Sequence, residues 1–168
     1  GHVYAWSGRV GEGISLLQQA LTAYESADIG FFHSMSVAQL GEGYLLAEQV
    51  HDARACADRA VRLARERGER GHEAWALRLL GEVASHHDHP DVATAETHYG
   101  AAMALANELG MRPLAAHCHR GLGTLYATLG QLEQVRTECS LAIELYKAME
   151  MSFWLPEAEA TLAQVEER

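Results

Sequence analysis

The sequence predicts an all-α protein built from repeated pairs of helices. Alanine and leucine dominate its 168 residues, whereas runs of the β-branched residues that favour strands are scarce. A Leu-Gly motif also recurs at a nearly constant spacing, because its glycines (Gly41, Gly81 and Gly123) lie 40 and 42 residues apart. Self-similarity at such a period is typical of stacked helical repeats. Composition and periodicity therefore agree on one class of fold.

The Leu-Gly motif lies in the first helix of each expected pair. Its three copies read Leu40-Gly41-x2-Tyr44, Leu80-Gly81-x2-Ala84 and Leu122-Gly123-x2-Tyr126. A glycine inside a helix costs about 1 kcal/mol relative to alanine. Its recurrence therefore predicts that a neighbouring helix comes very close at this point, while the leucines and tyrosines fill the remaining space between helices.

A second motif is a single alanine in the second helix of each pair. Its four copies are Ala20, Ala60, Ala101 and Ala142, which are 40, 41 and 41 residues apart. We expect these alanines to allow the same close approach as the glycines. The first copy belongs to a repeat whose first half is missing.

Eight helices are expected, and residues that start or stop helices mark their ends. The expected ranges are 11–28, 32–47, 51–68, 72–87, 91–109, 113–129, 132–149 and 153–167. The first helix ends before Gly30, and the second carries the first Leu-Gly motif. The third has Asp52 in its first turn, which suits the helix dipole, and ends at Gly68. The fourth follows Gly71 and carries the second Leu-Gly motif.

The four later helices are marked in the same way. The fifth follows Pro90 and ends before Gly110. The sixth starts at Pro113, carries the third Leu-Gly motif and ends before Gly130. The seventh carries the last alanine of the second motif, and the eighth has Pro156 in its first turn. Proline suits a first turn because its missing N–H would have no helical partner there.

Together these motifs resemble the tetratricopeptide repeat (TPR) family, whose pattern is W-x2-L-G-x2-Y followed by an alanine in the second helix. The chain departs from it at the tryptophan position, which holds Val37, Leu77 and His119, and its period is about 41 rather than 34. The resemblance implies a right-handed superhelix of antiparallel helix pairs, a TPR-like α-solenoid. A period of about 40–47 also fits HEAT-type repeats, which are the structural alternative.

The resemblance covers almost the whole chain as a single TPR-like domain over 1–168, with about 3.5 repeats and a closing helix. The expected units are the half repeat 1–30, the repeats 31–71, 72–112 and 113–151, and the closing helix 152–168. Segments 108–126 and 149–159 are similar to the C-terminal TPR region of large bacterial signalling proteins. In those proteins an adenylate cyclase domain or a transcriptional regulator is joined to an AAA-type ATPase. This similarity implies a cytoplasmic fragment of a longer regulator.

In TPR proteins the first helix of each pair lines a concave face, which is where a partner would bind. The residues implied for this groove are Met35, Glu42, Trp75, Arg78, Glu82, His117, Arg120 and Thr124. On this interpretation Arg78 and Arg120 bind a peptide carboxylate or an acidic side chain, and Trp75 anchors an apolar residue. The alternative is that Arg78 pairs with Glu42 or Glu82, and Arg120 with Glu82, so that the set only solvates the face.

Net charge, hydropathy and cysteine content argue against several function classes. The net charge of −10 disfavours binding to nucleic acid, and no run of 18 apolar residues predicts a membrane span. Segment 51–70 is the exception, because its six arginines outnumber its four acidic residues. It is either a solvated helix face or a docking stripe for an acidic partner. The 3 cysteines include no CxxC pair, which argues against a disulfide framework or a thiolate zinc site and fits a reducing compartment.

Candidate chemistry is sparse. His86, His87 and His89 form a cluster, but in a surface loop we expect adventitious metal binding at best. The His117-Cys118-His119 run cannot face one ion, because adjacent helical residues point about 100° apart. We therefore expect no metal site, no cofactor and no enzymatic activity. No motif marks a catalytic nucleophile.

The expected function is a protein–protein interaction module, a scaffold or docking tail that binds a protein or peptide partner or other domains of its parent chain. A regulatory sensor of a small molecule or signalling peptide is one alternative. Self-association is another, because the first helix lacks its partner. That helix should expose Ile14, Leu17 and Leu21, which would favour a homodimer.

Overall fold

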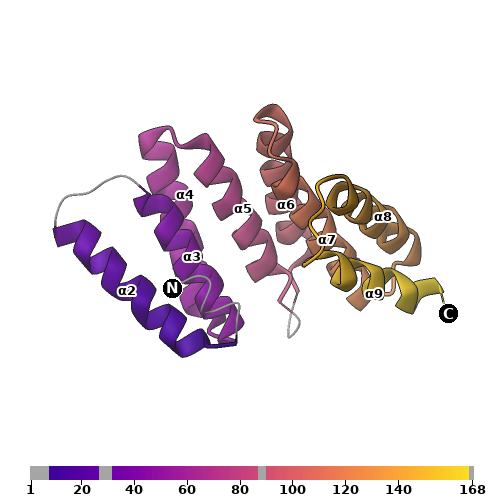
Figure 1. The fold of residues 1–168 in the computed structure, drawn as a ribbon, viewed down its shortest axis with the longest axis horizontal. Coiled ribbons are helices and arrows are strands. Elements are labelled where there is room, and N and C mark those ends of the chain that lie inside the picture. The colour runs from indigo at the N-terminus through magenta and orange to yellow at the C-terminus, as the bar shows by residue number, and fades with distance from the viewer. Residues whose placement is uncertain (1–7, 27–31, 87–89, 167–168) are drawn as a thin grey trace.

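The computed structural model describes residues 8–26, 32–86 and 90–166, and every regular element in these ranges is an α-helix. The helices are α2 (Val10–Ser26), α3 (His33–Leu46), α4 (Val50–Arg67), α5 (Arg70–Ala84), α6 (Val92–Glu108), α7 (Arg112–Thr128), α8 (Leu132–Ala148) and α9 (Leu155–Glu166) (Figure 1). Each expected helix is present, and every boundary lies within about three residues of its predicted position, the margin that end fraying allows. The all-α prediction is confirmed.

The helix ends follow the predicted stop signals in most places. Gly68, Gly110 and Gly130 adopt left-handed φ angles of 67°, 68° and 70° directly after or near helix ends. Gly71 differs, because it lies in the first turn of α5 and caps no helix. Gly30, another predicted stop, lies outside the described residues.

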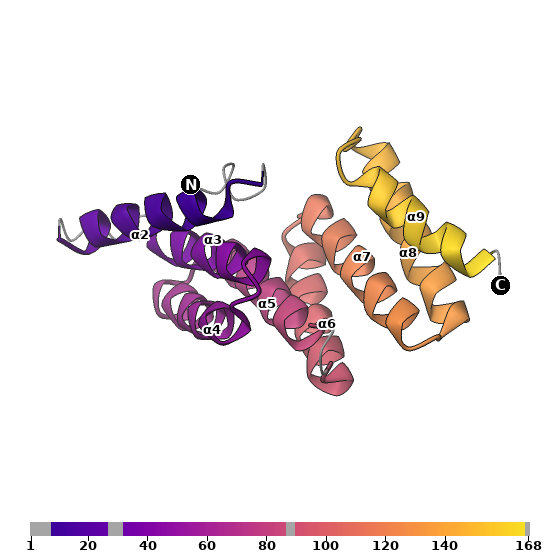
Figure 2. The same ribbon diagram turned by 90° about the horizontal axis from the view of Figure 1, so that it is seen from below.

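The helices follow one another in chain order along the long axis of the molecule, as Figures 1 and 2 show. Each helix packs against the next one in the chain. In addition α3 contacts α5, α5 contacts α7, and α7 contacts α9. These four helices therefore form one layer, which we call the odd-numbered layer. Helices α4, α6 and α8 pack against it between successive members.

The three motif glycines mark points where a side chain of another helix packs directly against the helix backbone. A Cβ at Gly41 would lie 2.8 Å from Leu79 Cδ2, and one at Gly81 would lie 2.8 Å from the ring of Tyr99. A Cβ at Gly123 would lie only 2.5 Å from the sulfur of Cys139. Real Cβ atoms do not come this close, so each glycine permits the approach that its recurrence predicts.

The large residues of the same motif fill the core beside these contacts. Leu40, Leu80 and Leu122 are buried. Tyr44 and Tyr126 are half-buried, and their hydroxyl groups bond to other helices. Gln18 Nε2 donates to Tyr44 Oη at 2.8 Å, and Tyr126 Oη donates to Glu96 at 2.7 Å. Both tyrosines thus join their repeat to the helix before it.

The alanine motif is correct in two helices and shifted in a third. Ala60 and Ala142 are completely buried and Ala20 is half-buried, but Ala101 is exposed. Its neighbour Ala102 is completely buried and takes the expected place in α6. The connection before α6 spans 85–91, whereas those before α4 and α8 span only 47–49 and 129–131. This longer connection shifts the register of α6 against α5.

Helix α2 is packed more closely than the sequence suggests. Leu17 and Leu21 are buried against α3, and Ile14 is half-buried. The expectation that these three residues form an exposed apolar surface is therefore wrong. The apolar stripe of α2 packs against the next helix, α3.

Candidate interaction face

The eight predicted groove residues all lie on the odd-numbered layer. Met35 and Glu42 are on α3, whereas α5 and α7 carry the other six, which are Trp75, Arg78, Glu82, His117, Arg120 and Thr124. Residues from three different repeats are thus brought to one side of the molecule. We call this side the interaction face.

Arg78 lies at the centre of the interaction face, and both of its terminal nitrogens are bound by other residues. It is only 3% exposed, and its two terminal nitrogens donate to Glu42 on α3 and to Glu82 on α5. Its guanidinium also lies over the ring of Trp75, 5.1 Å from the centroid. Burial alone would lower the pKa of Arg78, but Glu82 and Glu42 outweigh it and raise that pKa. Arg78 therefore stays charged and is unavailable to a ligand carboxylate.

Arg120 is also paired, but with a residue that the sequence analysis missed. It donates to Glu157 on α9, rather than to Glu82 as the alternative interpretation expected. Its guanidinium lies 5.0 Å from the ring centroid of Trp154, which precedes α9. The closing segment is therefore part of the interaction face. Among the described residues, the Nε atoms of Arg78 and Arg120 are buried without a hydrogen-bond partner.

His117 packs inside the face instead of pointing to solvent. Its Nδ1 lies 2.8 Å from Tyr146 Oη, and its ring centroid lies 5.8 Å from that of Trp75 and 5.0 Å from that of Trp154. Burial, with Arg78 and Arg120 nearby, lowers the pKa of His117 to about 3. The imidazole is therefore neutral near pH 7 and serves as an aromatic link between α5, α7 and the start of α9.

Two hollows open on the interaction face, one on each side of Arg78. The α3–α5 hollow has a volume of about 230 Å³ and is lined by Met35, Ala38, Gln39, Glu42 and Trp75. The α5–α7 hollow has a volume of about 220 Å³ and includes Glu82, Arg120, Thr124, Thr128 and Glu157 in its wall. Six of the eight predicted residues line one of these hollows. Arg78 and His117 instead hold the helices that form them.

Burial disfavours the charged form of Glu82 in the α5–α7 hollow. Its burial raises its pKa, Arg78 counteracts this, and Glu42 and Glu157 raise the pKa further. The two cations of the face, Arg78 and Arg120, are thus outnumbered by three carboxylates. Glu42 and Glu82 are largely buried, whereas the side chain of Glu157 is 55% exposed.

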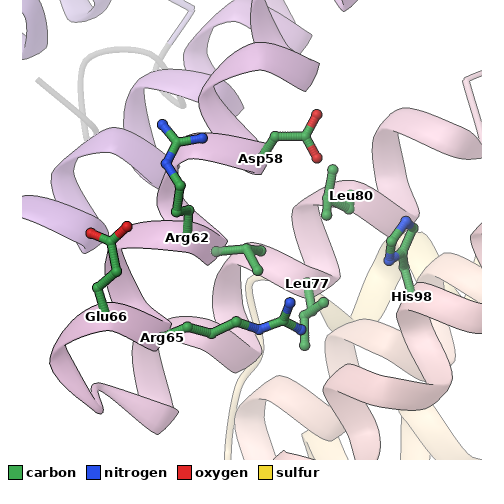
Figure 3. A pocket seen from close by; sticks show the side chains of 8 residues that line it. Asp58, Arg62, Arg65, Glu66, Leu77, Leu80 and His98 are labelled. Atoms are coloured by element: carbon green, nitrogen blue, oxygen red, sulfur yellow. The ribbon is translucent and has the colours of Figure 1, made fainter.

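The arginine-rich segment 51–70 covers α4 and reaches the first residue of α5, and most of its arginines are paired. The pairs join Arg54 to Asp58, Arg59 to Glu25, Arg65 to Glu73 and Arg70 to Glu108, at 3.9, 2.5, 2.7 and 2.5 Å. A hollow of about 390 Å³ lies here between α4, α5 and α6. Figure 3 shows Arg65 reaching across it towards Leu77 and His98, whereas Arg62 points away. Asp58 and Glu66 balance the formal charge of the two arginines in its wall.

Of the two histidine clusters that the sequence analysis set aside, the structure describes His117-Cys118-His119 in full and only His86 of the other. His87 and His89 lie outside the described residues, and His86 lies 2.8 Å from Glu48. His119 Nδ1 lies 2.6 Å from Glu138, whereas Cys118 is buried and burial raises its pKa to about 12. The described ranges contain no group of three or more residues able to hold a metal ion. None of the helices in these ranges is long and apolar enough to cross a membrane.

Comparison with known proteins gives no further guide. No protein-family model matches the chain, and no curated protein matches its sequence. The TPR resemblance therefore stays a prediction that rests on the motifs and on the observed packing of adjacent helix pairs.

Proposed function

We propose that the chain is a protein-interaction module of the TPR type, the docking tail of a bacterial signalling or regulatory protein in the cytoplasm. Its partner is a peptide segment that lies across the interaction face and inserts side chains into the two hollows. The observation that carries this proposal is the pair of adjacent hollows, whose walls combine residues from three repeats. Side-chain pockets spaced along a row of helices suit an extended segment.

Two ion pairs hold the helices of this face together. Arg78, which is buried, ties α3 to α5, and Arg120 ties α7 to Glu157 on α9, whose side chain is 55% exposed. This role replaces the predicted one, in which the two arginines bind the ligand directly. A preformed face loses less conformational entropy when a partner binds.

A sensor of a drug-sized small molecule is the weaker candidate. Pockets for such ligands commonly measure about 300–1,000 Å³. The two hollows of the interaction face measure about 220 and 230 Å³, which suits single side chains better than a whole ligand.

Site-specific photo-cross-linking tests the proposal. A photoreactive amino acid replaces Gln39, which lines the α3–α5 hollow, or Gln134, which is exposed on α8 away from it. We expect a specific partner to be cross-linked in cells from position 39 and not from position 134. Equal cross-linking from both positions, or none from position 39, would contradict the proposed face.

A further inference from the structure

We propose that the segment bound by the interaction face is basic, with two lysine or arginine residues four to six positions apart, each entering one hollow. This inference rests on the proposed function and names the chemistry of the partner. It reverses the prediction from sequence, in which Arg78 and Arg120 would select an acidic ligand.

The charges of the face support a cationic ligand. One guanidinium, that of Arg78, neutralises two carboxylates, because Glu42 and Glu82 both accept from it. Arg120 pairs with the third, Glu157. The walls of the two hollows therefore hold three carboxylates, of which Glu42 and Glu82 are largely buried and Glu157 is 55% exposed. Within the described chain, Arg120 is the single cation among the residues that line the two hollows.

The α3–α5 hollow has the wall that a long basic side chain needs. Met35 and Ala38 offer apolar surface beside the indole of Trp75, and Glu42 lies at the same hollow. Lysine and arginine bury an aliphatic stem against apolar surface while the charged head reaches a carboxylate. A glutamate of the partner would instead meet the carboxylate of Glu42, which is mostly buried and therefore poorly screened.

The hydroxyl groups of the α5–α7 hollow point to the same ligand. Thr124 Oγ1 donates to the carbonyl of Arg120 at 3.1 Å, and Thr128 Oγ1 donates to the carbonyl of Leu125 at 2.7 Å. Since each hydroxyl hydrogen is already used, these oxygens can only accept further hydrogen bonds. Lysine and arginine heads only donate, and the carboxylate of Glu82 in the same wall also accepts.

The separation of the hollows sets the spacing of the basic residues. The α3–α5 and α5–α7 hollows lie one helix apart, and packed helix axes are about 8–10 Å from each other. They are also displaced along α5, because the first hollow meets this helix at Trp75 and the second meets it at Glu82 and Ser85, which adds about 10–15 Å at about 1.5 Å per residue. The combined separation is about 13–18 Å, which an extended polyproline II segment covers in about four to six residues at about 3.1 Å per residue.

Selection from a library of randomised dodecapeptides, displayed on phage and captured on the immobilised chain, tests this inference. We expect the selected pool to be enriched in pairs of basic residues four to six positions apart. A fluorescent copy of the most enriched peptide should bind Gln39→Arg about tenfold more weakly than the unmodified chain, because the added cation lies at the α3–α5 hollow. The matched change Gln134→Arg, on the exposed side of α8, should alter the affinity less than twofold. Circular dichroism melts confirm that both variants fold.

The outcomes separate the inference from the function on which it rests. A pool that is acidic or uncharged, but still loses affinity with Gln39→Arg, would overturn the basic ligand and leave the proposed face intact. A basic pool that binds Gln39→Arg and Gln134→Arg equally would overturn the assignment of the ligand to these hollows. A library that yields no enriched peptide would overturn both.

Discussion

Tyr99 gives the sharpest test of how the repeat helices pack. Its ring is 1% exposed and lies between two glycines, because a Cβ at Gly81 would lie 2.8 Å from its Cδ1 and one at Gly121 would lie 2.4 Å from its hydroxyl. The ring therefore cannot shift away from α5 without entering α7. We expect Gly81→Ala to destabilise the fold even though alanine is the better helix former.

The magnitude follows from two opposing effects. Extra volume in a tightly packed core costs about 1–3 kcal/mol, and the rigid ring body of Tyr99 places this site in the upper half of that range. Replacing a helical glycine by alanine returns about 1 kcal/mol. The expected net loss is therefore about 1–2 kcal/mol, or roughly 2–8 °C in melting temperature for a chain of this length.

The matched control is Gly100→Ala in α6. Gly100 is exposed, and a Cβ built there would have nothing within 4 Å, so only the helix-propensity effect applies. This variant should raise the unfolding free energy by about 0.5–1 kcal/mol. Urea unfolding followed by circular dichroism measures both variants. If Gly81→Ala stabilised the chain as much as Gly100→Ala, the close contact of α5 with Tyr99 would be refuted.

Three further predictions concern buried polar groups. Replacing Arg78 by alanine should lower the free energy of unfolding in urea at pH 7 by about 3–5 kcal/mol, because two carboxylates lose their cation. The control Arg136→Ala, at an exposed position of α8, should lower it by less than about 1 kcal/mol. Similar losses in the two variants would contradict the central role of Arg78. His117 has a folded pKa of about 3, below its unfolded value of about 6.5, so it stabilises the fold above pH 6.5 and loses that contribution as pH falls towards 3. His117→Gln should therefore show a flatter decline of unfolding free energy between pH 6.5 and 4, and an unchanged decline would refute the assignment. Burial raises the pKa of Cys118 to about 12, so iodoacetamide at pH 8 should label this thiol far more slowly in the folded chain than in urea. Mass spectrometry measures the two labelling rates, and equal rates would be inconsistent with this packing.

The sequence predicts the helices well because the signals are local. Prolines, glycines and the Leu-Gly motif act within one or two turns, and helix ends such as Gly68 and Gly110 lie where the sequence places them. The motif glycines also predict close contacts, since a glycine inside a helix has few other uses. The sequence does not predict that Ala102 rather than Ala101 is buried, because this depends on how the longer connection before α6 positions that helix against α5.

The candidate site is predicted in outline, but the roles of its residues are not. Helical periodicity places Arg78 and Arg120 on the sides of α5 and α7 that meet other helices of the odd-numbered layer. It cannot show that they are buried or which carboxylate each one meets, because both depend on packing between helices. Glu157 and Trp154 were missed for that reason, although an acidic first turn after a tryptophan is visible in the sequence.

The central claim is that a partner binds across α3, α5 and α7, and the indole resonance of Trp75 reports on it most directly. The chain has 3 tryptophans, so a nitrogen–proton correlation spectrum contains few indole signals, and Trp75→Phe assigns the relevant one. On titration with the most enriched peptide, we expect the Trp75 signal and the backbone amides of α3, α5 and α7 to shift together. Shifts confined to α4, α6 and α8, with the Trp75 signal unmoved, would contradict the account.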